Sequence, residues 1–234
     1  MNENTETTIF MLSPIFIAGT IFLIYLLWKH WPQKPVHEEV LPPPRDPNSI
    51  PSPAERQKAV NHLRVAFSHF EDAFAKAKDH NEQAASFYHA ARSIVFARSL
   101  DPNAQIQVKE DGEMRTYALD ELGARILYYE SDSNYAHAKH LEDVRQKHIS
   151  SGIAFSYDGK QKTRRLDRNI AEAARAAVEP AEKAALYQPY NTFYLVHLIR
   201  VYTAAGFHQK AQQVLNRALE ADPDNVELLK LNQF

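Results

Sequence analysis

The chain contains no cysteine and only six glycines. Without cysteine there is no disulfide framework, no thiolate nucleophile and no thiolate metal site. Six glycines leave little material for a phosphate-binding loop, and neither a GxSxG nor an HExxH motif occurs. The sequence therefore predicts a protein that is not an enzyme and that has no cofactor.

A strong excess of charge of one sign is also missing. The chain has 27 Lys and Arg residues against 29 Asp and Glu residues, and its formal net charge is −2. Nucleic-acid-binding domains are usually clearly basic, so we expect no nucleic acid among the partners. The hydrophobic content of 44% is ordinary for a globular chain and allows a sizeable core.

The 11 histidines are the main candidates for metal binding. His137 and His140 are three residues apart and share one face of a predicted helix, with Glu130 and Glu142 not far away. No third ligand follows at a recognisable spacing, and histidines are common on helix surfaces. We therefore expect no metal site, and an enzyme that uses these histidines is the least favoured functional hypothesis.

The N-terminal region contains a long uncharged run from Thr7 to Trp28. As a helix, about 22 residues extend roughly 33 Å, which is enough to cross the hydrocarbon core of a bilayer. A cleavable signal peptide is the alternative, but Glu3 and Glu6 precede the run and no small-x-small cleavage site follows it. We predict a single transmembrane helix at residues 7–31.

Charges flank this predicted helix unequally. Lys29 and Lys34 lie just beyond its C-terminal end, whereas the N-terminal flank carries only carboxylates. Because lysine and arginine favour the cytoplasmic side of a membrane, we predict a single-pass membrane protein with its N-terminus outside and its C-terminal domain cytoplasmic.

A proline-rich segment, residues 32–53, follows the predicted membrane helix. It contains most of the 13 prolines of the chain, including Pro42, Pro43 and Pro44, so it cannot form the interior of a helix or sheet. We predict an extended, semi-rigid linker that reaches up to roughly 60 Å at about 3.1 Å per residue. A ligand for an SH3-type domain is the less favoured interpretation.

The remaining residues, 54–234, are predicted to form a mainly α-helical domain. Ser52, Pro53 and Glu55 have the pattern of a capping box, which starts a helix that runs to about Lys78. A second helix follows the polar turn at 79–81, and its apolar spacing predicts antiparallel packing on the first. Further helices are predicted at 119–131, at 134–150 and at 166–187, the last one bent at Pro180.

Two Asp-Gly pairs interrupt the helical pattern, at Asp111-Gly112 and Asp158-Gly159. Segments of alternating character flank both pairs, so we predict two small inserted β-hairpins, at 105–117 and 153–165. A threonine and a Leu-Asp pair follow each Asp-Gly pair at equal offsets. This similarity is either a duplication with a period of 47 residues or chance.

The most specific pattern lies in residues 191–224. Apolar residues recur at helical spacing up to Tyr202, the pattern stops at Gly206, and it begins again at Ala211, which predicts a helical hairpin. The stretch resembles one unit of the tetratricopeptide repeat (TPR) family, a motif of about 34 residues. The residues that carry this resemblance are Tyr202, Gly206, Ala211, Ala218, Leu219 and Pro223.

The match departs from the family pattern at Ile199, where a small residue is preferred, and at His208, where an aromatic residue is preferred. An unrelated helical hairpin is the alternative interpretation. A single repeat cannot bury its own apolar face, so the resemblance implies degenerate helical hairpins beside it. Residues 225–234 are predicted to be the C-terminal cap, and we expect Pro223 to open the helix there.

Two candidate binding sites follow from these patterns. In the repeat family the first helix of each hairpin lines a concave groove, so the resemblance implies partner-binding roles for Phe193, Val196, Arg200 and Thr203. Alternatively, these residues pack against the neighbouring alanine-rich helix. The second site, for an acidic partner or anionic lipid, consists of cations on the second predicted β-hairpin, unless they form only a solvated strand face. These cations are Lys160, Lys162, Arg164, Arg165 and Arg168.

The expected function is therefore protein binding at a membrane. We expect a scaffold or an assembly subunit of a membrane complex that binds a peptide or partner protein through a TPR-like groove. The alternative is a structural subunit fixed in a multi-subunit membrane machine, for example a secretion or transport complex, with no separate ligand. In both cases the expected partners are other subunits of a membrane complex.

Overall fold

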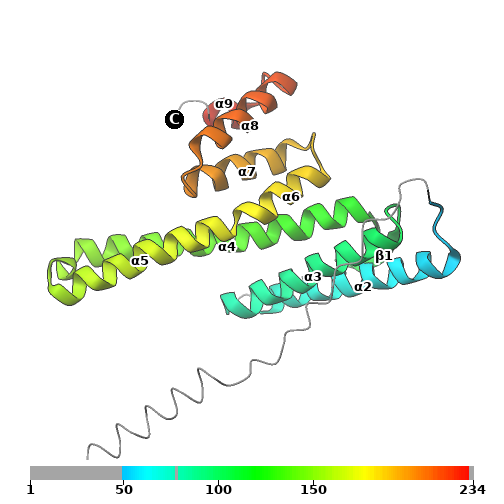
Figure 1. Cartoon of the computed structure of the whole chain (residues 1–234), viewed down its shortest axis with the longest axis horizontal. Coiled ribbons are helices and arrows are strands. Elements are labelled where there is room, and N and C mark those ends of the chain that lie inside the picture. The colour runs from blue at the N-terminus through cyan, green and yellow to red at the C-terminus, as the bar shows by residue number, and fades with distance from the viewer. Residues whose placement is uncertain (1–48, 77–78, 232–234) are drawn as a thin grey trace, which may run out of the picture. The chain divides into compact units, whose positions relative to one another are not determined.

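The computed structural model describes residues 49–76 and 79–231, and these residues belong to one structural unit. They form a mainly helical structure with one small two-stranded antiparallel sheet (Figure 1). The predicted transmembrane helix at 7–31, and the linker up to residue 48, lie outside the described residues. Within the described part of the chain, no helix combines the length and the hydropathy that a membrane crossing requires.

The first two helices form the predicted antiparallel pair, α2 (Pro53–Ala75) and α3 (His80–Leu100). The predicted capping box starts α2, because the Ser52 hydroxyl accepts from the Glu55 amide and the Glu55 carboxylate accepts from the Ser52 amide. Asp79 caps α3 by accepting from two amides of its first turn. These local hydrogen bonds explain why the helix starts were predictable from the sequence.

The hairpin predicted at Asp111-Gly112 is confirmed. Strands β1 (Gln105–Glu110) and β2 (Glu113–Ala118) pair antiparallel, and the two turn residues have φ angles of 51° and 88°. Positive φ at both central residues is what a two-residue hairpin turn of type I′ requires. Ile106 pairs with Tyr117 across the strands, and both side chains are buried in the first apolar cluster.

The second predicted β-hairpin is wrong. Residues 153–155 form a short 3-10 helix, η1 (Ile153–Phe155), and α5 (Tyr157–Ala176) begins immediately after it. Gly159 lies in the first turn of α5, where its amide donates to the Ser156 hydroxyl, the helix cap, at 3.0 Å. A Cβ atom there would lie 1.8 Å from the Ile153 carbonyl oxygen, so this glycine is required for space and not for a turn. The two Asp-Gly pairs therefore do not mark a structural duplication.

Helix α4 (Leu119–Ser150) is continuous, so the break predicted after Ser131 is wrong. Polar side chains at the expected break have tertiary partners. The Ser131 hydroxyl donates to the Ala177 carbonyl at 2.7 Å, and the Ser133 hydroxyl donates to Gln83 at 2.6 Å. These bonds let polar residues occupy the interior of a long helix that contacts other helices on several sides.

The remaining helices follow α5 in sequence: α6 (Val178–Tyr187), α7 (Thr192–Ala204), α8 (His208–Ala221) and α9 (Val226–Leu231). The helix predicted at 166–187 is divided at Ala177, close to the bend expected at Pro180. The helical hairpin predicted at 191–224 is present as α7 and α8, and Gly206 between them has a φ of 81°. Asn225 caps α9, so Pro223 lies in the preceding turn and does not open that helix.

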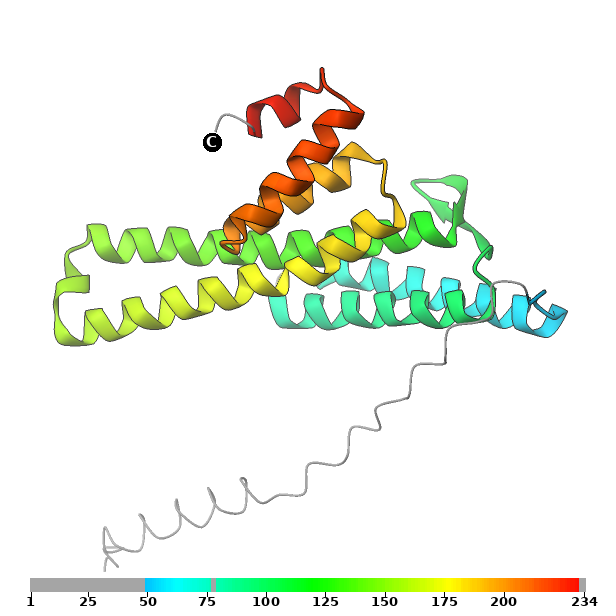
Figure 2. The same cartoon turned by 45° about the horizontal axis from the view of Figure 1, so that its top comes forward.

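Helix α4 lies between the α2–α3 pair and the α6–α9 helices (Figures 1 and 2). One apolar cluster joins α2, α3 and the start of α4, and it includes the fully buried Leu63, Phe87 and Ile126. A second cluster joins α6 to α9 and includes Val201 and Leu228. Each such side chain contributes roughly 1.5–3 kcal/mol on burial, so these two clusters hold the helices together.

Candidate partner-binding surface

The candidate groove residues on α7 have different exposures. The side chain of Phe193 is 56% exposed, and Arg200 and Thr203 are also exposed. Val196 is only 3% exposed and belongs to the second apolar cluster with Tyr202 and Leu228. Of the four predicted residues, three are therefore accessible to a partner, and Val196 is a core residue.

Phe193 is part of a cluster of rings from two helices that are distant in sequence. Its ring centroid lies 4.6 Å from that of Tyr128 in α4 and 5.5 Å from that of Tyr194 in α7. The centroids of Tyr128 and Tyr194 are 5.9 Å apart, so the three rings are mutual neighbours. We call Tyr128, Phe193 and Tyr194 the aromatic surface.

The two tyrosines of this surface are half-buried and stay neutral at physiological pH. Burial, and then the charge of Asp132, raise the pKa of the Tyr128 hydroxyl, and burial also raises the pKa of Tyr194. Both hydroxyls can therefore act as hydrogen-bond donors beside an exposed apolar ring. Such a mixture of ring surface and polar atoms is typical of residues that dominate protein interfaces.

Arg200 adds a positive charge to the same helix. Its guanidinium lies 3.9 Å from the Glu227 carboxylate in α9, and the side chains are 49% and 64% exposed. A surface ion pair of this length contributes at most about 1 kcal/mol. Arg200 can therefore exchange this contact for an acidic group of a partner at little cost.

Tyr128 and Tyr194 were not among the predicted site residues. Tyr128 comes from α4, 65 positions before Phe193 in the chain, and no repeat spacing connects the two. The only local signal is that Phe193 and Tyr194 are adjacent aromatics near the start of α7, while Tyr128 and Tyr129 are adjacent in α4. Sequence alone does not show that these pairs meet.

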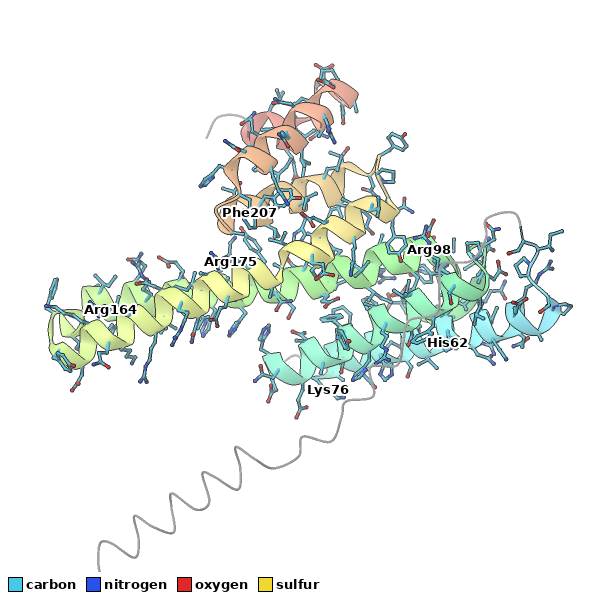
Figure 3. All side chains as sticks on the ribbon, in the orientation of Figure 1. His62, Lys76, Arg98, Arg164, Arg175 and Phe207 are labelled. Atoms are coloured by element: carbon cyan, nitrogen blue, oxygen red, sulfur yellow. The ribbon has the colours of Figure 1, made fainter. Side chains whose placement is uncertain are left out.

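The five predicted cations all lie on α5, not on a β-strand, and all five are exposed. Lys160, Arg164 and Arg168 are four residues apart and so share one helix face, whereas Lys162 projects from a different one. Figure 3 shows Arg164 near the start of α5 and Arg175 near its end. Among the described residues, none of the five forms an ion pair within 4 Å.

His137, one of the two candidate metal ligands, packs against another histidine. His137 stacks on His80 of α3 with ring centroids 4.1 Å apart, and burial first and then a neighbouring histidine lower the pKa of both. Two neutral stacked rings therefore join α3 to α4. No group of three potential metal ligands gathers anywhere in residues 49–76 and 79–231.

A buried serine and histidine also meet, but their geometry does not fit a nucleophile and its base. The Nε2 atom of His197 lies 2.8 Å from the Ser131 hydroxyl, whose own proton goes to the Ala177 carbonyl. Ser131 has no exposed surface, so no substrate can reach it. Its two hydrogen bonds connect α7, α4 and the Ala177 carbonyl between α5 and α6.

No protein-family model matches this chain, and no significant match was found among characterised proteins or solved structures. The TPR resemblance of residues 191–224 stays a prediction. The functional argument therefore depends on the surface chemistry of the helical domain itself.

Proposed function

We propose that this protein is a membrane-anchored scaffold or assembly subunit that binds a partner protein through the aromatic surface and Arg200. The predicted transmembrane helix at 7–31 is the anchor, and the predicted proline-rich linker separates it from the helical domain. The α7–α8 hairpin, with its resemblance to a TPR unit, presents Phe193, Tyr194 and Arg200 on the first helix of the pair, and α4 adds Tyr128.

The proposal depends on one observation: the Phe193 ring stays exposed to solvent although it packs against the Tyr128 ring. A phenylalanine ring that remains more than half exposed beside another aromatic ring is available for burial by a partner. The ring is held by contacts from α4 and α7, so little conformational entropy is lost when a partner covers it. Arg200 on the same helix favours a partner segment that is mainly apolar and carries one acidic group.

A second candidate function is that of a structural subunit fixed in a multi-subunit membrane machine. Large apolar side chains outside the aromatic surface favour it, since Leu186 and Tyr190, just before α7, are 77% and 93% exposed. A permanent interface is larger and more apolar than a transient one. Extraction from membranes at high salt separates the two functions, because a fixed subunit keeps its partners and a recruiting scaffold loses them.

The test of the main proposal is a double variant, Phe193→Ala with Arg200→Glu, in the full chain. Partner recovery from membranes is expected to weaken by roughly 2 kcal/mol or more, because hot-spot residues at the centre of an interface have effects of this size. The thermal midpoint should change little, since both side chains are exposed.

The matched control places the same two changes on α2 and α3. Tyr88→Ala with Arg64→Glu removes one exposed ring and reverses one exposed charge far from α7 in sequence, and it should leave partner recovery unchanged. The proposal is overturned if the Phe193→Ala, Arg200→Glu variant loses much of its stability while its folded fraction binds the partner normally. That result would place Phe193 and Arg200 in the core.

A further inference from the structure

The chain reversal between α4 and α5 exposes three large apolar side chains. Ile153, Phe155 and Tyr157 are 58%, 75% and 77% exposed. Figures 1 and 2 show this reversal at the far end of the α4–α5 hairpin, away from α2, α3 and α7 to α9. We call residues 147–165 the hairpin tip.

The exposure at the hairpin tip is not that of a loosely held loop. The Ser156 hydroxyl accepts from the Gly159 amide at 3.0 Å and donates to the Ile153 carbonyl at 2.8 Å. The buried His148 ring of α4 contacts the Gly159 carbonyl at 3.1 Å. These bonds tie η1 to the first turn of α5 and tie that turn to α4, so the exposed apolar side chains are carried by a well-defined backbone.

The hairpin tip is also strongly basic. It has one acidic residue, Asp158, and no cation of the tip forms an ion pair within 4 Å among the described residues. The exposed cations of the tip are Lys147, Lys160, Lys162, Arg164 and Arg165. This local excess of positive charge contrasts with the formal net charge of −2 of the whole chain.

A shallow hollow of about 350 Å³, open to solvent, lies on the surface of the hairpin tip. Its apolar lining comes from Ile149, Ala154 and Phe155, while Lys160 and Arg164 supply two positive charges. The hydroxyl of Thr163, which also lines it, already donates to the Gly159 carbonyl. Apolar walls beside two cations match a ligand that combines a hydrocarbon chain with an anionic head group. A phospholipid has this combination.

We propose that the hairpin tip is a contact site for an anionic phospholipid bilayer. Phe155, Tyr157 and Ile153 enter the boundary between head groups and acyl chains, where aromatic and aliphatic side chains are favourable. The surrounding lysines and arginines attract the negative surface potential of the bilayer. The site is separate from the aromatic surface, so it is independent of the partner proposed above.

The geometry favours a bilayer over an acidic protein segment. The apolar side chains project from the end of a helical hairpin and are flanked by cations from both helices, which suits insertion into a planar surface. If residues 7–31 form the predicted anchor, the linker keeps the domain within roughly 60 Å of the membrane. That restriction gives the bilayer a high effective concentration at the tip.

The absence of cysteine allows a direct test in the full chain. We would label Ile153→Cys with an environment-sensitive fluorophore and reconstitute the protein in vesicles of phosphatidylcholine, with or without phosphatidylserine. The expected result is a blue shift of the emission only in vesicles that contain phosphatidylserine. High salt should reverse it, because salt screens exposed charges. The same label on Gln209→Cys, an exposed position in α8, should not respond.

Charge variants complete the test. Lys160→Glu with Arg164→Glu should abolish the shift, whereas Arg175→Glu with Arg217→Glu, two exposed cations outside the hairpin tip, should preserve most of it (Figure 3). The proposal is overturned if the label at 153 responds equally in phosphatidylcholine alone, or not at all in phosphatidylserine. It is also overturned if only an added polyglutamate peptide shifts the emission, because the tip would then be a site for acidic proteins.

Discussion

The imidazole of His197 in α7 lies 2.8 Å from the hydroxyl of Ser131 in α4, and both side chains are buried. Because the Ser131 proton is donated to the Ala177 carbonyl, the His197 Nε2 atom must carry the proton that it donates to Ser131. Two consecutive hydrogen bonds thus connect α7, α4 and the junction between α5 and α6. The helices that present the aromatic surface are held together at this point.

The first prediction concerns pH. Burial, and then the charge of Arg200, lower the pKa of His197 to about 4, so the folded state holds this ring neutral. Its contribution to stability is fully present above the unfolded pKa of about 6.5. As pH falls from about 6.5 toward the folded pKa, the free energy of unfolding decreases by on the order of 3 kcal/mol.

Urea unfolding at a series of pH values from neutral to mildly acidic measures this effect. The His197→Phe variant keeps a ring but cannot titrate, so it should lose less stability on acidification than the natural chain. His80 and His137 also have lowered pKa values, so acidification destabilises the folded state through them as well. They are present in both the natural chain and the variant, so their effect cancels in the comparison. Equal pH slopes for the two proteins would contradict the prediction.

The second prediction is that Glu130→Gln stabilises the protein at neutral and higher pH. Burial is the main cause that raises the pKa of Glu130 to about 7, with Lys183 acting in the opposite direction. The folded state therefore disfavours the ionised carboxylate, and the natural protein becomes less stable as pH rises from about 4.5 through 7. A neutral glutamine avoids this cost, which is about 1–3 kcal/mol once relaxation is allowed for.

Differential scanning calorimetry at two pH values checks this prediction. At pH above 7 the Gln variant should unfold at a higher temperature than the natural chain, and near pH 4.5 the difference should shrink. A variant that is less stable at both values would show that the Glu130 carboxylate makes a favourable interaction in the folded state.

The third prediction is that Gly159→Ala disrupts the hairpin tip. The added methyl group would lie 1.8 Å from the Ile153 carbonyl oxygen, so η1 must move away from α5. We expect a loss of roughly 1–3 kcal/mol, typical of forced overpacking, and faster hydrogen exchange confined to the tip. Gln161→Ala, at an exposed position two residues later, is the control and should leave exchange unchanged. Unchanged exchange in the Gly159 variant would be incompatible with the close approach of η1.

The fourth prediction is that residues 52–234 fold without the N-terminal segment. The apolar faces of α2 to α9 have partners within this range, in the two main clusters and a small one between α4 and α5. The fragment should be soluble, with a cooperative thermal transition followed by circular dichroism. Aggregation under mild conditions would instead favour the fixed structural subunit, whose exposed apolar residues require permanent partners.

Local signals account for what was predicted correctly. The Ser52–Glu55 capping box, the Asp111-Gly112 turn and the Gly206 helix stop each depend on hydrogen bonds and φ angles within a few residues. The second Asp-Gly pair shows the limit of this reasoning. Asp158-Gly159 has the same two residue types as the hairpin turn at Asp111-Gly112, but the Ser156 cap and the packing of η1 on α4 place it at the start of a helix.

By itself, the sequence determined that residues 54–234 are mainly helical, where several helices begin, and which residues form the α7–α8 hairpin. These features follow from apolar periodicity and capping chemistry, which act over short distances along the chain. Only the tertiary structure decided that α4 is continuous, that Val196 is buried and that Tyr128 meets Phe193. The reason is physical: burial and ring contacts depend on which helices become neighbours, and those helices are separated by tens of residues.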